Sequence, residues 1–329
     1  MTPLNLKNDG KVIARVYASN YDSLALDQLR KLSSLDGYCF INAFPDLHAG
    51  NDYPVGYVMK TKHMFYPRLT GADIGCNVRG YKVNGKIDDR ELQKCAEYIK
   101  KNFTGTKDIP SIGGGNHFFE IERDAQDNTW FIVHTGSRYI GGEVYRALNE
   151  ELKLTKAIGF NTKSMLFMNI YSEYTRAEQY AMENSKEILD ASMKFLNIVA
   201  QDKICTLHNT INVEGDHVYH YKGASYVKDG EYALIPLSMG EGTLVVESLA
   251  TSKLFNGINH GAGRQMTRRE AKEKLDSTSL EGINYLADSM PLDEAPAAYK
   301  NISDDIKWLE ENGYIKVKAH LKPVVTVKE

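Results

Sequence analysis

The sequence predicts a single mixed α/β domain over residues 1–329, and three observations support this fold class. Short apolar runs such as 39–41 and 130–133 have the length of buried strands, and each leads into polar sequence rich in glycine or histidine. Other segments repeat apolar residues at helical spacing. No linker rich in proline, glycine or serine divides the chain, so we expect one compact unit.

The helices are predicted from apolar spacing and from their end signals. Residues 88–102 begin with acidic side chains and end with basic ones, as the helix dipole favours. The segment 163–202 contains almost no glycine or proline, which predicts one long helix or two in tandem. A shorter helix is expected after Thr267, because Thr267 and Glu270 match the capping-box pattern.

The remaining strands are predicted in the second half of the chain. Residues 217–227 and 232–237 read as short strands, and the tail 314–328 alternates in strand fashion. The loops at strand ends carry the polar residues, which is where active-site residues are found in mixed α/β folds.

Composition excludes some classes of protein. Hydrophobic content of 42% and charged content of 25% are ordinary for a globular chain, and the net charge of -3 means that a nucleic-acid partner needs a local basic patch. There is neither an apolar run of 18 residues nor a signal-peptide core. Since no such run is present, we expect no membrane partner. Four irregularly spaced cysteines form no disulfide framework, so we expect a reduced, cytoplasmic setting.

The stretch 259–264 is the most informative motif. His260 stands between small residues and Arg264 follows it. Neutral imidazole is a nucleophile, glycine lets the backbone approach a ligand, and arginine holds phosphate oxygens with a two-pronged fork. A His-Gly pair alone is usually a turn, but this combination indicates a histidine that attacks phosphorus.

Three further segments carry potential metal ligands. Asp73 and Cys76 share a glycine-containing turn, His117 follows the glycines 113–115, and His134 ends the apolar run 130–133. A surface turn and a satisfied core histidine are the alternatives. Thiolate, imidazole and carboxylate together fit Zn²⁺, Mn²⁺ or Fe²⁺ better than Mg²⁺ or Ca²⁺.

Other polar residues are weaker candidates when taken singly. His208 follows the long helical segment, where a His-Asn pair is commonly a cap. Asp46 is a candidate acid-base group, whereas His48 reads as a loop histidine. The loop 236–243 bears hydroxyl groups that suit a nucleotide, although the chain has neither a Walker A loop nor a complete Rossmann fingerprint.

Taken in order, these motifs resemble the RtcB family of RNA ligases. The resemblance covers most of the chain, and it is carried by 45–48, 71–79, 113–120, 134–138, 208–209, 222–224, 238–240, 260–264, 294–300 and 322–324. It implies a mixed-sheet fold around a buried metal centre. It also implies an enzyme that uses GTP and Mn²⁺ to join an RNA 3′-phosphate or 2′,3′-cyclic phosphate end to a 5′-hydroxyl end.

The resemblance also assigns roles to residues. His260 corresponds to the histidine that becomes covalently guanylylated, and Arg138 falls where the family holds the RNA phosphate. The positions of two metal ions, bridged by Cys76, correspond to Asp73, Cys76, His117, His134 and His208. The guanine-nucleotide positions correspond to Asn116, Glu120, Ser238, Thr243, Arg264, Tyr299 and Lys328.

Some positions depart from the family pattern. Leu237 and Ala297 stand where glycine is common, and the chain is shorter than the best-known members. We therefore expect a divergent RNA ligase that serves RNA repair or tRNA splicing. We expect Zn²⁺ or another divalent ion to replace Mn²⁺ in vitro, and we count an activating protein among the expected partners. The alternatives are a metal-dependent phosphodiesterase or nucleotidyltransferase without the covalent histidine step, and an RNA-end-binding protein with a decayed site.

Overall fold

Two six-stranded sheets form the frame of the protein in this computed structural model, which describes residues 2–106 and 108–329. The first sheet has the strand order β1-β2-β3-β4-β12-β11, and β2 and β3 are its parallel pair. Its strands are β1 (Leu4–Asn8), β2 (Lys11–Val16), β3 (Tyr38–His48), β4 (Val55–Lys62), β11 (Asn209–Glu214) and β12 (His217–Lys222).

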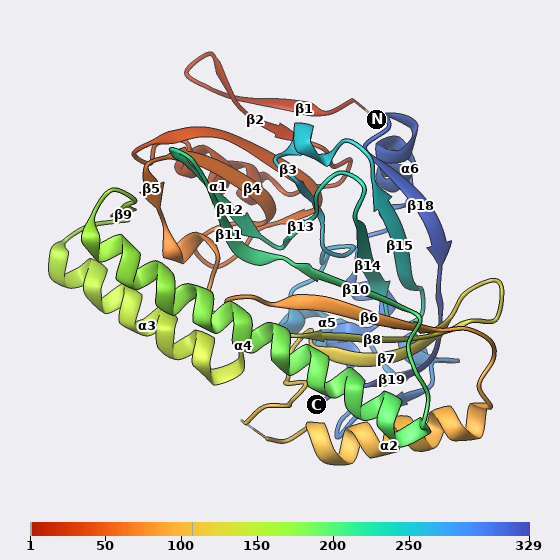
Figure 1. Cartoon of the computed structure of the whole chain (residues 1–329). Coiled ribbons are helices and arrows are strands. Elements are labelled where there is room, and N and C mark those ends of the chain that lie inside the picture. The colour runs from red at the N-terminus through yellow and green to blue at the C-terminus, as the bar shows by residue number, and fades with distance from the viewer. Residues whose placement is uncertain (1, 107) are drawn as a thin grey trace.

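The second sheet has the order β10-β6-β8-β7-β19-β17, with β17 and β19 parallel. A three-stranded sheet, ordered β14-β15-β18, adjoins it (Figure 1). The second sheet contains β6 (Asn77–Val83), β7 (Phe118–Arg123), β8 (Thr129–Thr135), β10 (Asp202–Leu207), β17 (Tyr285–Leu286) and β19 (Lys322–Val327). The smaller strands are β5 (Met64–Phe65), β9 (Phe160–Asn161), β13 (Ala224–Tyr226), β14 (Tyr232–Ser238), β15 (Gly242–Ser248), β16 (Gly257–Asn259) and β18 (Ile315–His320). The mixed α/β fold class predicted from the sequence is confirmed.

The described residues form six α-helices, of which two pack against the second sheet and a third packs against one of these two (Figure 1). They are α1 (Ser23–Leu32), α2 (Asp89–Phe103), α3 (Arg138–Thr155), α4 (Met165–Leu196), α5 (Arg268–Lys274) and α6 (Ser303–Glu311). The prediction for 88–102 is confirmed by α2, and the long segment forms one helix, α4. The capping box at Thr267 is present at the start of α5.

Two sequence-based expectations about strand ends are wrong. Strand β3 continues through Asp46 to His48 instead of ending near Ile41, so neither residue is in a loop. His208 does not cap a helix, because α4 ends at Leu196 and β10 intervenes. The apolar run at 39–41 gave no sign of this extension, since Pro45 and the charged residue after it resemble a turn.

Helix α4 supports the loops that lead into the candidate site. The buried Asn184 side chain donates from Nδ2 to Ser111 O, Thr135 Oγ1 and Gly136 O, each at 3.0 Å. Its Oδ1 accepts a 2.8 Å bond from Ser111 N. A buried polar atom must find a partner, so this one amide fixes two loops relative to α4. Among the described residues, no helix combines the length and the apolar character needed to cross a membrane.

We predict that Asn184→Ala lowers the free energy of unfolding by about 2–4 kcal/mol, because buried loop groups lose their partners. Urea denaturation measures the change. Asn169→Ala, at an exposed position of the same helix, is the matched control and should change stability by less than about 0.5 kcal/mol. Equal effects of the two variants would contradict the role given to Asn184.

Candidate active site

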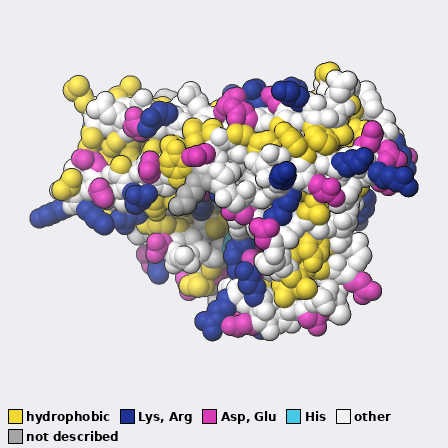
Figure 2. Space-filling view, turned by 90° about the horizontal axis from the view of Figure 1, so that it is seen from below, with side chains coloured by type: hydrophobic (Ala, Val, Ile, Leu, Met, Phe, Trp, Pro, Cys, Tyr) yellow, Lys and Arg dark blue, Asp and Glu magenta, His cyan; other side chains and the backbone are white. Residues whose placement is uncertain are grey.

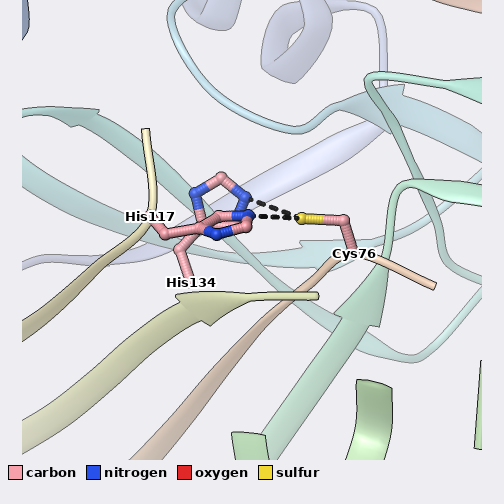
Figure 3. A group of neighbouring side chains, drawn as sticks. All are labelled: Cys76, His117 and His134. Atoms are coloured by element: carbon pink, nitrogen blue, oxygen red, sulfur yellow. Dashed lines mark hydrogen bonds between the residues drawn. The ribbon is translucent and has the colours of Figure 1, made fainter. Parts of the chain in front are cut away.

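A thiol and two imidazole rings converge at the ends of the second sheet's central strands (Figure 3). Cys76 Sγ lies 3.4 Å from His117 Nε2 and 3.3 Å from His134 Nε2. Asp73 Oδ2 lies 3.0 Å from His117 Nε2, and His208 Nε2 lies 3.1 Å from His134 Nε2. The structure therefore brings together the five predicted metal ligands, with Cys76 in the middle of the row.

Strand pairing explains why residues so distant in sequence meet. His134, near the end of β8, pairs with Val78 on β6 and with Phe118 on β7. Cys76 immediately precedes β6, and His117 immediately precedes β7. Antiparallel neighbours present such positions at one edge of the sheet, so the three side chains share one edge.

The spacing of these atoms fits a metal ion. For tetrahedral coordination with bonds of about 2.3 Å to sulfur and about 2.0 Å to nitrogen, the two ligand atoms lie about 3.5 Å apart. The separations of 3.3 and 3.4 Å around Cys76 agree with that value. His134 Nδ1 lies 3.1 Å from Asn116 O, and this contact leaves Nε2 free for the ion.

Burial sets the electrostatics of the ligand groups. It raises the pKa of the Cys76 thiol well above its usual value, and the Asp73 carboxylate adds to the effect. Burial and neighbouring imidazoles hold the pKa values of His134 and His208 well below their usual range. Burial alone would raise the pKa of Asp73, but His117 beside it lowers the pKa instead. Neutral imidazoles are the form that ligates metals.

His260 lies beside this group and is held from one side. Its Nδ1 is 2.6 Å from Asp46 Oδ2 and 2.7 Å from Gly223 O, and its backbone N–H donates to Asp46 Oδ2 at 3.0 Å. Both neighbours of Nδ1 are acceptors, so Nδ1 carries the proton and Nε2 keeps its lone pair. The His260 ring centroid is 4.6 Å from that of His208.

Asp46, the predicted acid-base residue, contacts the His260 ring through one carboxylate oxygen, Oδ2. Its side chain is fully buried behind the His260 ring, at 0% exposure. Gly263 has φ +75°, and a Cβ there would lie 2.6 Å from Asp46 Cα, so only glycine allows this approach. We infer that Asp46 orients His260.

A cavity of about 380 Å³ opens in front of the ligand atoms and of His260. Figure 2 shows a hollow on the lower face of the molecule, with Lys and Arg near it and with charges of both signs across that face. Six of the seven predicted nucleotide residues line the cavity. They are Asn116, Glu120, Ser238, Arg264, Tyr299 and Lys328.

Thr243 and Arg138 lie outside the described lining of that cavity. Thr243 is buried and bonds Glu122 through both its backbone N and its Oγ1, at 3.1 and 2.8 Å. Arg138 begins α3, donates from Nε to Ser111 Oγ at 3.0 Å, and has Nη1 3.5 Å from His117 Nδ1. Arg138 thus contacts the candidate metal ligand His117 at Nδ1, the ring nitrogen that lies away from Cys76.

The family comparison agrees with this geometry. The sequence profile of the RtcB family, described as tRNA-splicing ligase RtcB, matches residues 28–106 and 85–329 of the chain.

The chain belongs to the RtcB family.

Individual RtcB proteins are similar over most of the chain. RNA-splicing ligase RtcB2 of Escherichia coli is 29% identical, with 93% of this chain and 92% of the relative aligned. RNA-splicing ligase RtcB1 of the same strain is 26% identical, with 88% of this chain and 90% of the relative aligned. The tRNA-splicing ligase RtcB of Pyrococcus furiosus is 27% identical over 74% of this chain, which corresponds to 32% of that longer protein.

Membership in the RtcB family draws attention to a residue that the sequence-based reasoning overlooked. Glu294 Oε1 accepts from Arg268 Nη1 at 2.6 Å and from Arg264 Nη1 at 3.2 Å. Its Oε2 lies 2.6 Å from Tyr299 Oη and 3.2 Å from Lys328 Nζ. Glu294 therefore organises the cationic end of the cavity. The sequence signal for Glu294 is its place in the motif 294–300, in which the resemblance gives a role only to Tyr299.

The two departures from the RtcB pattern have small structural consequences. Ala297 is exposed and lies in the 3-10 turn Pro296–Ala298, where its φ is not positive. Since residues of any type can adopt this backbone conformation, the alanine causes no strain. Leu237 lines the cavity and narrows it where a glycine would not.

We predict that Cys76→Ser abolishes the binding of two divalent ions per chain, because thiolate bridges metals better than a hydroxyl does. Elemental analysis after dialysis against Mn²⁺ or Zn²⁺ measures the stoichiometry. Cys39→Ser, at an exposed cysteine, is the control and should retain full binding. A Cys76→Ser protein that still holds two ions and keeps its fold by circular dichroism would rule out the bridging role.

Proposed function

We propose that this protein is an RNA ligase that joins RNA 2′,3′-cyclic phosphate or 3′-phosphate ends to 5′-hydroxyl ends through a GMP–His260 intermediate. The observation that carries the proposal is the state of His260. Its Nδ1–H is held by Asp46 and Gly223, so Nε2 is free beside the metal-ligand group and the cavity. A positioned neutral imidazole of this kind is an activated nucleophile.

The first chemical step is nucleotide transfer to the enzyme. His260 Nε2 donates its lone pair to the α-phosphorus of GTP, a P–N bond forms, and the P–O bond to pyrophosphate breaks. The positive charge that develops on the ring is stabilised by the Asp46 carboxylate, whose Oδ2 lies 2.6 Å from Nδ1. Two Mn²⁺ ions, held by Asp73, Cys76, His117, His134 and His208, would neutralise charge on the phosphate oxygens.

The second and third steps transfer GMP to RNA and then release it. An oxygen of the RNA 3′-phosphate attacks the phosphorus of GMP, and the P–N bond to His260 breaks. The 5′-hydroxyl of the second RNA end then attacks the activated 3′-phosphorus, and GMP leaves. A cyclic phosphate end is first hydrolysed to a 3′-phosphate.

The lining of the cavity supports a guanine nucleotide. Glu120 is buried on β7, and burial together with the neighbouring Glu122 raises its pKa well above the usual range. The Glu120 carboxyl group lines the cavity, and even when it is neutral its carbonyl oxygen can accept a hydrogen bond from an N–H of the guanine edge. Tyr299, over whose ring Arg264 Cζ lies at 5.0 Å, offers an aromatic face, and Lys328 offers donors.

We predict that His260→Ala retains metal binding but forms no GMP adduct when incubated with α-labelled GTP and Mn²⁺, because the attacking nitrogen is gone. The measurement is acid-labile label on the denatured protein. His63→Ala, at a residue outside the cavity lining, should be labelled like the wild type. Labelling of a lysine instead, or no labelling of the wild type, would favour lysine chemistry or a phosphodiesterase.

We assign the RNA 3′-phosphate to Arg138, and we predict that Arg138→Ala slows the joining of 3′-phosphate ends more than it slows His260 guanylylation. Single-turnover rates of the two steps measure the difference, and RNA binding should weaken steeply as salt rises. Equal loss in both steps would mean that Arg138 serves His117, which it contacts at 3.5 Å, and would exclude the RNA assignment.

A further inference from the structure

Lys300 is a buried lysine whose ammonium group donates its hydrogen bonds to backbone carbonyl oxygens. Its Nζ donates to Asn20 O at 2.8 Å, to Pro45 O at 3.4 Å and to Leu47 O. An ammonium has three donors, and three acceptors are present. Only 5% of the residue is exposed. Lys300 is therefore occupied in the fold and is not available as a nucleophile.

Two of these carbonyls flank Asp46 directly. Pro45 and Leu47 are its neighbours in β3, so the ammonium fixes the backbone on both sides of the carboxylate that contacts His260. The backbone N–H of Lys300 also donates to Gly263 O at 2.9 Å. Gly263 belongs to the loop that carries His260, so one residue connects the segment of the carboxylate with the segment of the nucleophile.

Charge accounts for the choice of lysine. Burial lowers the pKa of Lys300, and the carboxylates of Asp46, Asp22 and Asp305 counter that effect. A positive charge behind a fully buried Asp46 reduces the cost of keeping that carboxylate ionised. A neutral side chain of the same length would leave three carbonyls without a donor and Asp46 without a nearby cation.

We propose that Lys300 is a positioning residue for guanylylation, which it serves by holding Asp46, and through it the His260 imidazole, in the attacking orientation. The proposal rests on His260 being the nucleophile. It predicts an effect on the rate of attack and little effect on GTP binding, because neither Lys300 nor Asp46 lines the nucleotide cavity among the described residues.

The test compares Lys300→Met, Lys300→Arg and the exposed control Lys307→Met on α6. We expect Lys300→Met to lower kcat for guanylylation by about 100-fold, as misplacement of a reacting group does, with KM for GTP within about threefold. Lys300→Arg keeps the charge and should recover part of kcat. Lys307→Met should match the wild type.

A second readout does not depend on activity. In the wild-type protein loaded with diamagnetic Zn²⁺, the His260 Nδ1–H in its short bond to Asp46 should give a strongly downfield proton NMR signal. That signal should be lost or shifted in Lys300→Met, retained in Lys307→Met and restored in part in Lys300→Arg. If Lys300→Met does not fold, Lys300→Gln, which keeps two donors, takes its place in both measurements.

The outcomes separate this proposal from the proposed function. An unchanged kcat in a folded Lys300→Met protein, or a reduced kcat with an unchanged Nδ1–H signal, would overturn the positioning role. A wild-type protein that forms no adduct with GTP would instead overturn the function, while the NMR comparison would still report whether Lys300 holds the contact between Asp46 and His260.

Discussion

The hydrogen bond between Asp46 Oδ2 and His260 Nδ1, at 2.6 Å, is the interaction on which the proposed chemistry of this protein depends. It determines which ring nitrogen carries the proton and therefore which one can react. A fully buried carboxylate is costly, so the surrounding structure must stabilise it. The backbone N–H of His260, the close approach of Gly263 and the neighbouring Lys300 charge all converge on Asp46.

The two large sheets contribute different halves of the site. The first sheet provides Asp46 from β3, and the second provides the strand ends that carry Cys76, His117 and His134. His208 is the residue between β10 of the second sheet and β11 of the first. Its ring lies next to both His134 and His260. His260 and the candidate metal ligands are therefore adjacent because the chain crosses between the two sheets at His208.

Much of this was predictable from the sequence where one local signal sufficed. Helical spacing without glycine or proline predicts one long helix or two in tandem over 163–202, and the structure has the single helix α4 there. The capping box marks the start of α5. Helix α3 was not predicted, because it begins directly after a strand without a side-chain cap and contains Gly141 and Gly142 in its first turns. The extension of β3 to His48 depends on pairing with β4, which no local pattern encodes.

The candidate site shows the same division. The order of the motifs predicts the candidate ligand residues and His260. The contacts of Asp46 with His260, of Glu294 with its cationic neighbours and of Lys300 with the carbonyls beside Asp46 are tertiary contacts. Some of them join residues more than 200 positions apart, which no local pattern reveals. Thr243 is a further example: the resemblance implies nucleotide contact there, and in the structure its hydroxyl donates to the buried Glu122. Sequence position cannot tell which way such a side chain points.

We infer that Asp46 and Gly223 make Nε2 of His260 the reactive nitrogen. The most direct measurement is the site at which phosphorus becomes attached to the ring. The wild-type protein would be guanylylated with GTP and digested, and the His260 peptide would be examined by ³¹P–¹H correlation NMR. The account predicts a phosphoramidate on Nε2. Attachment at Nδ1 would contradict it, because that nitrogen is the one occupied by the two acceptors.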